Sequence, residues 1–196
     1  PRYYVAAAYW DRDAMTWSFP ALLRFDPAMA REALGYALGT QLRNTGTHSR
    51  FIDGVVLEDG FQLDAAAAPA IALADYLRAT GDRAFVAAHR DAIDHITATL
   101  AAVRDGTTGL YGSWQDAQDE YRRHSYLTTA NVMAWKALGG LAELNAALGR
   151  DDAAARLAAE ADQLRRAILQ HLVIEREGVR LFAAGWDGKA DYLVED

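Results

Sequence analysis

The sequence contains no cysteine, which excludes disulfides, thiolate metal ligands and a thiol nucleophile together. It also lacks any apolar run approaching the ~20 residues that a membrane-spanning helix needs. The N-terminus has no basic segment followed by an apolar one, the pattern of a signal peptide. These absences argue against a membrane partner. They favour the cytoplasm, although the lack of cysteine by itself leaves the compartment open.

Basic residues are in deficit, with 20 Lys and Arg against 27 Asp and Glu, a net charge of -7 and a pI near 5.2. A protein that must neutralise phosphates carries a basic face, so this charge argues against a nucleic-acid partner and favours neutral small molecules. The hydrophobic content of 52% in 196 residues is ample for one sizeable core. We therefore expect residues 1–196 to form a single domain, whose oligomeric state the sequence leaves open.

Motifs for metals and cofactors are also missing. There is no phosphate-binding glycine loop and no G-x-S-x-G nucleophile motif. The histidines are scattered, and the spacing of the closest two does not suit one helical face; they are His48, His89, His95, His124 and His171. We expect neither a metal site nor a cofactor.

Helical periodicity dominates, because Ala and Leu recur at three- and four-residue spacing, whereas strands have little support. Capping patterns add boundaries: Asp26 followed by Pro27, Gly81 followed by Asp82, and Gly149 followed by acidic residues. The predicted helices are 14–25 (interrupted near Pro20), 26–44, 61–81, 82–106, 126–149 and 151–173. Segments 45–60 and 107–125 are predicted loops, and the tail contains one short hairpin.

These helices form three hairpins, with short connections inside each pair and long connections between pairs. The long connections carry aromatic and charged residues. A ring of helix pairs has this asymmetry when its loops collect at one end, where sites are usually built. Three pairs would make half of a closed ring of six.

Four segments carry a resemblance to a known group of enzymes: "WDRD", "GFQLDAAAAPAIALADYLRATGD", "GLYGSWQDAQDE" and "NVMAWKALGGLAELNAALGRDDAAARLAAEADQLRRAI". Their order resembles that of the six-hairpin, (α/α)6-toroid glycosidases. The nearest similarity is to the glucoamylase and glucodextranase group, glycoside hydrolase family 15, and to amylo-α-1,6-glucosidase and family 63 enzymes. The resemblance extends over almost the whole chain.

The resemblance implies an all-α fold, with helical hairpins forming about half of an (α/α)6 toroid. Because the chain starts at Pro1 and stops at "DYLVED", we expect it to be the first part of a longer catalytic domain. The implied activity is that of a glycoside hydrolase, exo-acting on α-glucosidic or related α-linked oligosaccharides. It is expected to invert configuration with paired carboxylates.

The opening cluster supplies the first candidate site residues. In enzymes that look like this one, the Arg and Asp of the Trp-x-Arg-Asp loop hold hydroxyls of the terminal sugar, so the resemblance implies that Arg12 and Asp13 bind substrate. Trp10 would stack on the sugar ring or wall the pocket. The structural alternative is that Asp13 caps a helix near Ala14, Asp11 is solvated and Arg12 pairs with either.

The segment "EDGFQLD" supplies the second candidates. The resemblance places Gln62 and Asp64 before an inner helix at the cleft end of the barrel, where Asp64 would hold substrate or orient a neighbour. The alternative is again capping, since Asp59 or Asp64 is a suitable N-cap and acidic residues favour helix N-termini.

The loop "GLYGSWQDAQDE" is where we expect the proton donor. Glycoside hydrolysis needs one protonated and one ionised carboxyl group, and aromatic neighbours favour the protonated form by desolvation. Asp116 follows Trp114, itself a candidate sugar-binding residue, and Asp119 and Glu120 are alternative acids. Family 15 enzymes have Glu at the corresponding position, so this sequence departs from their pattern. A solvated acidic loop is the structural alternative.

The second carboxylate is expected beyond the end of this chain, which would leave residues 1–196 inactive in isolation. Two other classes stay open. A sugar epimerase or polysaccharide lyase on a similar toroid would need a His or Tyr base. A non-catalytic helical-repeat scaffold predicts no convergence of Trp10, Asp64 and Trp114 at one end.

Overall fold

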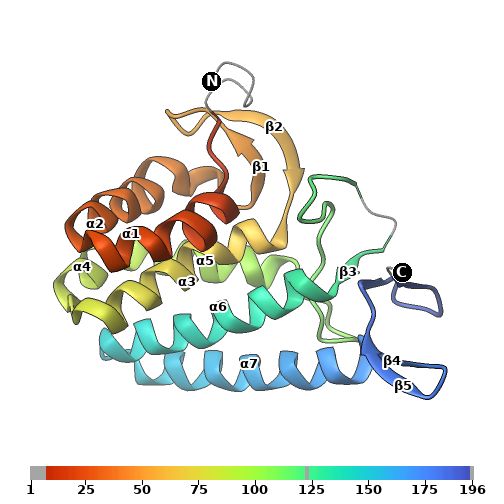
Figure 1. The fold of residues 1–196 in the computed structure, drawn as a ribbon. Coiled ribbons are helices and arrows are strands. Elements are labelled where there is room, and N and C mark those ends of the chain that lie inside the picture. Colours follow the sequence, from red (N-terminus) through yellow and green to blue (C-terminus); the bar gives the residue numbers. More distant parts are fainter. Residues whose placement is uncertain (1–7, 122–123, 195–196) are drawn as a thin grey trace.

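Three helical hairpins lie side by side in the computed structural model, which describes residues 8–121 and 124–194 (Figure 1). The first pairs α1 (Phe19–Phe25) with α2 (Pro27–Tyr36), and the second pairs α3 (Leu63–Thr80) with α4 (Arg83–Ala88) and α5 (Arg90–Ala102). The third pairs α6 (Thr128–Ala147) with α7 (Asp151–His171). Helix α3 packs against α6, and α6 against α7. The predicted pairing of helices is confirmed.

The predicted caps are present. The Asp26 carboxylate accepts from the Met29 amide at 3.0 Å, and the Asp82 carboxylate accepts from the Phe85 amide at 2.9 Å. Gly81 ends α3 in the left-handed conformation, with φ of 69°. Each cap supplies a partner for backbone groups that the helix end leaves unpaired.

The helices are less regular than periodicity predicts. The first is widened into a π-helical turn at Asp13–Ser18 and then runs on through Pro20, which lies in the first turn of α1. The second continues beyond α2 as a π-helical turn, Ala37–Gln41, and a 3₁₀ turn, Leu42–Asn44. The helix predicted at 82–106 is broken at His89, whose ring Nδ1 lies 2.8 Å from the carbonyl oxygen of Phe85.

Small sheets correct the all-α prediction. The predicted loop 45–60 contains an antiparallel hairpin of β1 (Thr47–Arg50) and β2 (Val56–Phe61), with Thr47 opposite Phe61 and Arg50 opposite Val56. In the tail, β4 (Val173–Arg176) and β5 (Val179–Phe182) form the expected hairpin. A further sheet has the order β3–β6–β7, from Tyr126–Leu127, Gly185–Trp186 and Tyr192–Leu193. The fold is therefore three helical hairpins with small β additions.

Small side chains let the inner helices approach closely. Helix α3 is buried along most of its length, with an alanine run from Ala65 to Ala68. On α6, a Cβ at Gly140 would lie 2.9 Å from the Cβ of Ala74, so only glycine fits there. This contact fixes the spacing of the second and third hairpins.

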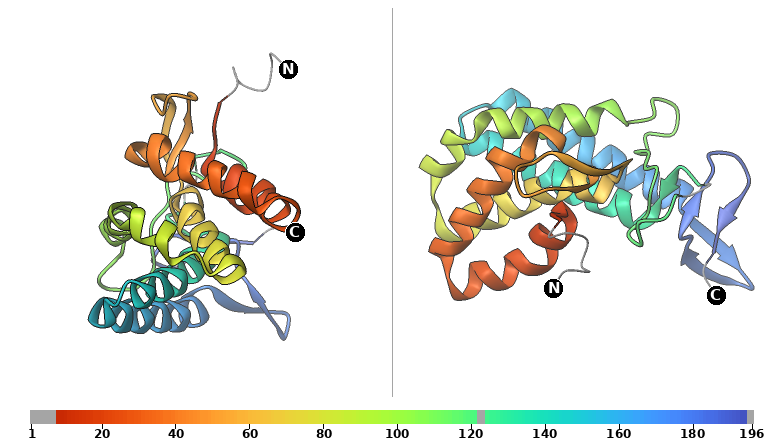
Figure 2. Two further views of the ribbon diagram at one scale, coloured as in Figure 1. Left: turned by 90° about the vertical axis from the view of Figure 1, so that its left-hand side faces the viewer. Right: turned by 90° about the horizontal axis from the view of Figure 1, so that it is seen from above.

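The helix that opens with Asp13–Ser18 and continues as α1 begins at the same end of the molecule as α3 and α6. The long loop at 103–121 and the C-terminal strands lie at this end too, as the views in Figures 1 and 2 agree. The predicted collection of inter-hairpin loops at one end is confirmed. Within the described ranges, the helices are too short or too polar to cross a bilayer.

Candidate functional site

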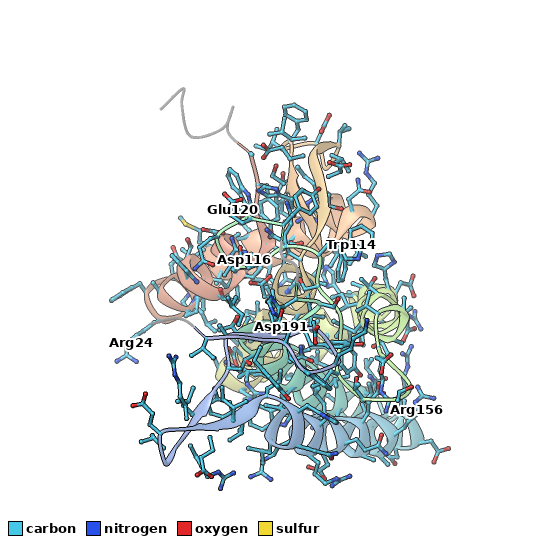
Figure 3. The ribbon with its side chains drawn as sticks, turned by 90° about the vertical axis from the view of Figure 1, so that its right-hand side faces the viewer. Arg24, Trp114, Asp116, Glu120, Arg156 and Asp191 are labelled. Atoms are coloured by element: carbon cyan, nitrogen blue, oxygen red, sulfur yellow. The ribbon has the colours of Figure 1, made fainter. Side chains whose placement is uncertain are left out.

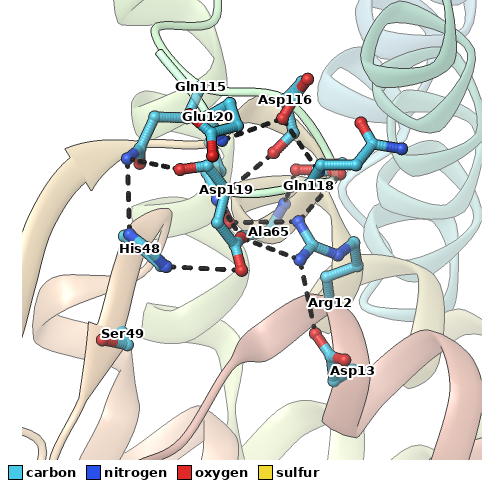
Figure 4. Close-up of polar contacts among 12 residues, drawn as sticks. Arg12, Asp13, His48, Ser49, Ala65, Gln115, Asp116, Gln118, Asp119 and Glu120 are labelled. Carbon is cyan, nitrogen blue, oxygen red and sulfur yellow. Dashed lines mark hydrogen bonds and ion pairs between the residues drawn. The ribbon is translucent and has the colours of Figure 1, made fainter. Parts of the chain in front are cut away.

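Arg12 is the centre of a polar cluster at this end of the molecule (Figure 4). Its guanidinium donates to the Gln62 side-chain oxygen at 3.2 Å and to Asp119 Oδ1 at 3.1 Å. It also lies 3.4 Å from Asp64 Oδ2 and 3.5 Å from Asp13 Oδ2. One side chain therefore joins the start of the first hairpin, the start of α3 and the loop before α6, which are up to 107 positions apart.

The cluster has a buried layer and an exposed layer. Gln62 and Asp64 are buried, whereas the side chains of Asp13 and Asp119 keep 35% and 36% of their surface exposed. Burial raises the pKa of Asp64, and the charge of Arg12 acts against that rise. Burial opposes the charge of Arg12, but the carboxylates of Asp64 and Asp119 outweigh it and raise its pKa. Arg12 thus stays charged and fixes two carboxylates that face solvent.

Asp119 is held in an uncommon backbone conformation, with φ of 66°. Aspartate tolerates this left-handed region better than most residues, and such a conformation persists only where the surroundings impose it. Here Gln62 Nε2 donates to Asp119 Oδ1 at 2.7 Å, in addition to the bond from Arg12. The loop is bent so that this carboxylate reaches the cluster.

Asp116, the predicted proton donor, shapes the same loop. Its Oδ1 accepts from the amides of Gln118 at 2.9 Å and Glu120 at 3.0 Å, and its carbonyl accepts from Gln62 Nε2 at 3.4 Å. Its side chain is largely buried and lines a small hollow of about 100 Å³. Leu127, Ala184 and Leu193 supply the apolar walls of that hollow.

The remaining predicted residues differ in exposure. Trp114 is 63% exposed and packs edge-on against Phe61, with 6.0 Å between ring centroids. Trp10 is buried, which suits lining the site better than stacking on a sugar. Glu120 is exposed. Figure 3 looks toward this end and shows Trp114, Asp116 and Glu120 on the central loop, far from Arg24 and Arg156 at the periphery.

Asn131 of α6 clamps the loop that carries these residues. Its Oδ1 accepts from the Tyr111 amide at 2.8 Å, and its Nδ2 donates to the carbonyls of Tyr111 at 3.0 Å and Leu127 at 2.9 Å. The side chain is fully buried. Its amide therefore adds to the backbone pairing of Tyr111 with Arg104 and ties the loop to the start of α6.

Replacing Asn131 with Ala should lower the free energy of unfolding by about 2–3 kcal/mol, because buried groups of Tyr111 and Leu127 lose their partners. Urea denaturation of the full-length protein measures this. Asn145→Ala is the matched control, since Asn145 is also buried on α6 but, within the described part of the chain, its side chain donates only to the Leu141 carbonyl of its own helix. An equal loss of unfolding free energy in the two variants would show that Asn131 does not hold the loop to α6.

His48 is a site residue that the sequence did not reveal. Its Nε2 lies 3.5 Å from Asp119 Oδ2 and 3.8 Å from Glu58 Oε2. Gln115 is the second unpredicted member, and its Nε2 lies 3.4 Å from His48 Nδ1. Both positions depend on β1 and β2, which were not predicted, so no spacing signal marked them.

Asp11 is not solvated, contrary to the alternative considered from sequence. It is fully buried and forms an ion pair with Arg50, 2.5 Å between Oδ2 and Nη2. Arg50 is also fully buried and donates to the carbonyls of Gln41 and Asn44 at 3.2 and 2.6 Å. Asp13 does not cap a helix either, because it lies inside the helical turn rather than before it. The pair of Asp11 and Arg50 instead ties the opening helix to β1.

No protein-family model and no curated protein matches the sequence. Solved structures do match. A Streptococcus pneumoniae metal-independent α-mannosidase, solved in a non-productive complex with α-1,6-mannobiose, superposes with a TM-score of 0.83 over 95% of this chain at 18% identity. A bacterial glucoamylase complexed with acarbose superposes with a TM-score of 0.72 over 91% of this chain at 16% identity. A Bacillus sp. GL1 family 78 rhamnosidase superposes with a TM-score of 0.73 over 95% of this chain at 19% identity.

The fold is that of the six-hairpin toroid glycosidases. The chain spans 56% of the mannosidase, 25% of the glucoamylase and 20% of the rhamnosidase. The predicted resemblance is confirmed at the level of fold. Such low identities leave the activity to be argued from the site.

Among the described residues, no cluster of three or more His, Asp or Glu side chains is arranged to hold a metal ion. The chemistry that this arrangement can perform is that of carboxylates held by a guanidinium. Such groups bind hydroxyls and transfer protons.

Proposed function

We propose that this chain is part of a glycoside hydrolase that acts on α-linked oligosaccharides, with the Arg12 cluster as the binding place of the terminal sugar. The observation that carries the proposal is the convergence of Arg12 from the start of the first hairpin, Asp64 from the start of α3 and Asp119 from the loop before α6 at one end of the toroid segment. Unlike the fully buried pair of Arg50 and Asp11, this cluster presents the part-exposed carboxylates of Asp13 and Asp119 to solvent, where a ligand can reach them.

The contacts suggest separate roles within the cluster. Both Nη atoms of Arg12 already contact oxygen atoms of the cluster, so Arg12 acts chiefly by fixing carboxylates. The exposed carboxylates of Asp13 and Asp119 then accept hydrogen bonds from sugar hydroxyls. Gln62 and Asp64 contact Arg12 from the buried side of the cluster. Trp114 offers an exposed ring for stacking on an apolar sugar face.

We assign the general acid to Asp116, with Asp119 and Glu120 as alternatives. In the inverting reaction, the acid gives its proton to the glycosidic oxygen as the bond to the anomeric carbon breaks. A base carboxylate takes a proton from the attacking water, which forms the new bond from the opposite face. We propose that the base lies outside residues 1–196, since the superposed enzymes are longer.

The choice of sugar follows from the comparisons. The structure with the highest of the quoted TM-scores is an α-mannosidase, and the glucoamylase binds acarbose. We therefore propose exo-cleavage of α-mannosides or α-glucosides. The deficit of basic residues fits a neutral substrate.

The test is turnover by the full-length protein of maltose, isomaltose, trehalose and α-mannobioses, with product anomers followed by NMR. Release of a β-anomer as the first product supports an inverting α-glycosidase. Release of the α-anomer would overturn inversion, and no cleavage of any of these would overturn the proposed substrate class.

His48 and Tyr121 favour one alternative. Both line the hollow beside Asp119, and a sugar epimerase or polysaccharide lyase needs a His or Tyr base. The same NMR experiment detects an epimerase, because epimerisation changes the configuration of a sugar without cleavage. A lyase removes a proton next to a carboxylate, which none of these sugars has, so it is tested with an oligosaccharide that contains a uronic acid, from which it yields an unsaturated product.

A further inference from the structure

Ser113 is a buried residue that lies outside the Arg12 cluster and next to the loop of the assigned acid. Its Oγ accepts a hydrogen bond from the Leu63 amide at 3.1 Å and donates one to the Gln115 carbonyl at 2.7 Å. A hydroxyl has one proton, so the carbonyl takes that proton and the amide meets a lone pair. Ser113 therefore joins the loop to the start of α3, 50 positions earlier in the chain.

The first turn of α3 needs a hydrogen-bond acceptor from outside the helix. The first amides of a helix have no carbonyl partner within it, and the side chain of the residue before the helix usually supplies one. Gln62 occupies that position without capping α3, because its side chain contacts Arg12 and Asp119 instead. Leu63 is fully buried, so its amide depends on a partner within the protein. Ser113 supplies that partner and leaves Gln62 available to the cluster.

Backbone hydrogen bonds attach the same part of the loop to β2. The amides of Trp114 and Gln115 both donate to the Phe61 carbonyl, at 3.0 and 3.2 Å, and the Ser113 amide donates to the Ser125 carbonyl at 2.9 Å. Phe61 is the last residue of β2, whereas the Ser113 hydroxyl reaches the first residue of α3. Removing the hydroxyl should therefore loosen the loop from α3 while the backbone keeps it attached to β2.

We propose that Ser113 is a positioning residue, which fixes the loop to α3 and thereby sets where the Asp116 carboxyl lies relative to the sugar-binding cluster. Its partner Leu63 directly precedes Asp64, and its partner Gln115 directly precedes Asp116. The inference rests on the proposed function, in which this loop carries the general acid. An acid must reach the glycosidic oxygen within hydrogen-bond distance, and a misplacement of about 1 Å can cost about 10²-fold in rate.

The test compares an α-linked disaccharide with the corresponding glycosyl fluoride, whose leaving group needs no proton. In the full-length protein, Ser113→Ala should lower kcat on the disaccharide about tenfold or more, change KM little and leave the rate on the fluoride nearly intact. Partial unfolding would instead lower both rates by the same factor. Ser113→Cys, whose thiol forms weaker hydrogen bonds, should give a smaller loss on the disaccharide and the same preference for the fluoride.

Thr128→Val is the matched control for these variants. It also removes a buried hydroxyl, which donates to the Ala183 carbonyl at the start of α6. It should lower the stability of the protein without changing the ratio of the rates on the two substrates. A ratio that is unchanged in Ser113→Ala, or equally lowered in Thr128→Val, would overturn the proposal.

Hydrogen exchange separates this proposal from the proposed function, because it needs no substrate. Mass spectrometry of the full-length protein should show faster exchange in Ser113→Ala than in the wild type for peptides covering residues 61–66 and 113–116, since the Leu63 amide loses its acceptor. Thr128→Val should leave the exchange of both peptides unchanged. Faster exchange in Ser113→Ala supports the attachment even if none of the sugars is cleaved, and unchanged exchange would overturn the proposal.

Discussion

Replacing Asp116 with Asn in the full-length protein is expected to lower kcat on an unactivated α-linked disaccharide by about 10²–10⁴-fold, the usual contribution of a general acid. Asn keeps Oδ1, so the bonds from the amides of Gln118 and Glu120 are retained and the loop keeps its shape. The corresponding glycosyl fluoride should keep most of its rate, because fluoride leaves without a proton. Steady-state kinetics on the two substrates measure the difference.

Asp119→Asn is the matched control for this prediction. Its Oδ1 can still accept from Arg12 and Gln62, but the negative charge beside His48 is lost. If Asp119 binds sugar, the variant should raise KM for the disaccharide and lower kcat less than Asp116→Asn does. If instead Asp119→Asn alone lost its rate on the disaccharide and kept its rate on the fluoride, the general acid would be Asp119. Retained turnover of the disaccharide by Asp116→Asn would exclude Asp116 as the general acid.

Replacing Asp11 with Ala should lower the free energy of unfolding by about 3–5 kcal/mol, because it leaves the guanidinium of Arg50 buried without its counter-charge. Both side chains of the pair are fully buried. Burial raises the pKa of Asp11, and the charge and hydrogen bond of Arg50 oppose that rise, so the pair depends on both partners. Denaturant unfolding of the full-length protein measures the loss.

Glu143→Ala provides the comparison for the buried pair. Glu143 pairs with Arg78 at 2.8 Å between α6 and α3, but both side chains are about half exposed. Exposed pairs contribute at most ~1 kcal/mol, so this variant should change stability little. A loss in Asp11→Ala no larger than in Glu143→Ala would show that the buried pair does not hold β1 to the opening helix.

The helical part of the fold was predictable because its signals are local. Asp26 and Asp82 cap their helices as expected, and the spacing of Ala and Leu gave the pairs. The hairpin of β1 and β2 was not predictable in the same way. Its first strand reads Thr-His-Ser-Arg, without the alternation of apolar residues that indicates a strand. Arg50 can be buried in this strand because it pairs with Asp11, which lies 39 positions earlier in the chain.

The candidate site likewise contains residues that could be predicted from the sequence and residues that could not. Resemblance singled out Arg12, Asp13, Gln62 and Asp64, and the structure brings them together. The sequence did not indicate that Arg12 is enclosed by its own neighbours, because this depends on the left-handed backbone at Asp119. His48 was missed because its role arises from pairing between strands. Whether Asp116 or Asp119 meets the leaving group depends on where the sugar lies.

A crystal structure of the full-length Asp116→Asn variant with α-1,6-mannobiose or maltose tests the central claim most directly. The account predicts that hydroxyls of the terminal sugar lie within about 3 Å of the carboxylates of Asp13 and Asp119, the usual hydrogen-bond distance. A sugar bound elsewhere, with both carboxylates facing only solvent and Arg12, would contradict the assignment of this cluster as the binding site.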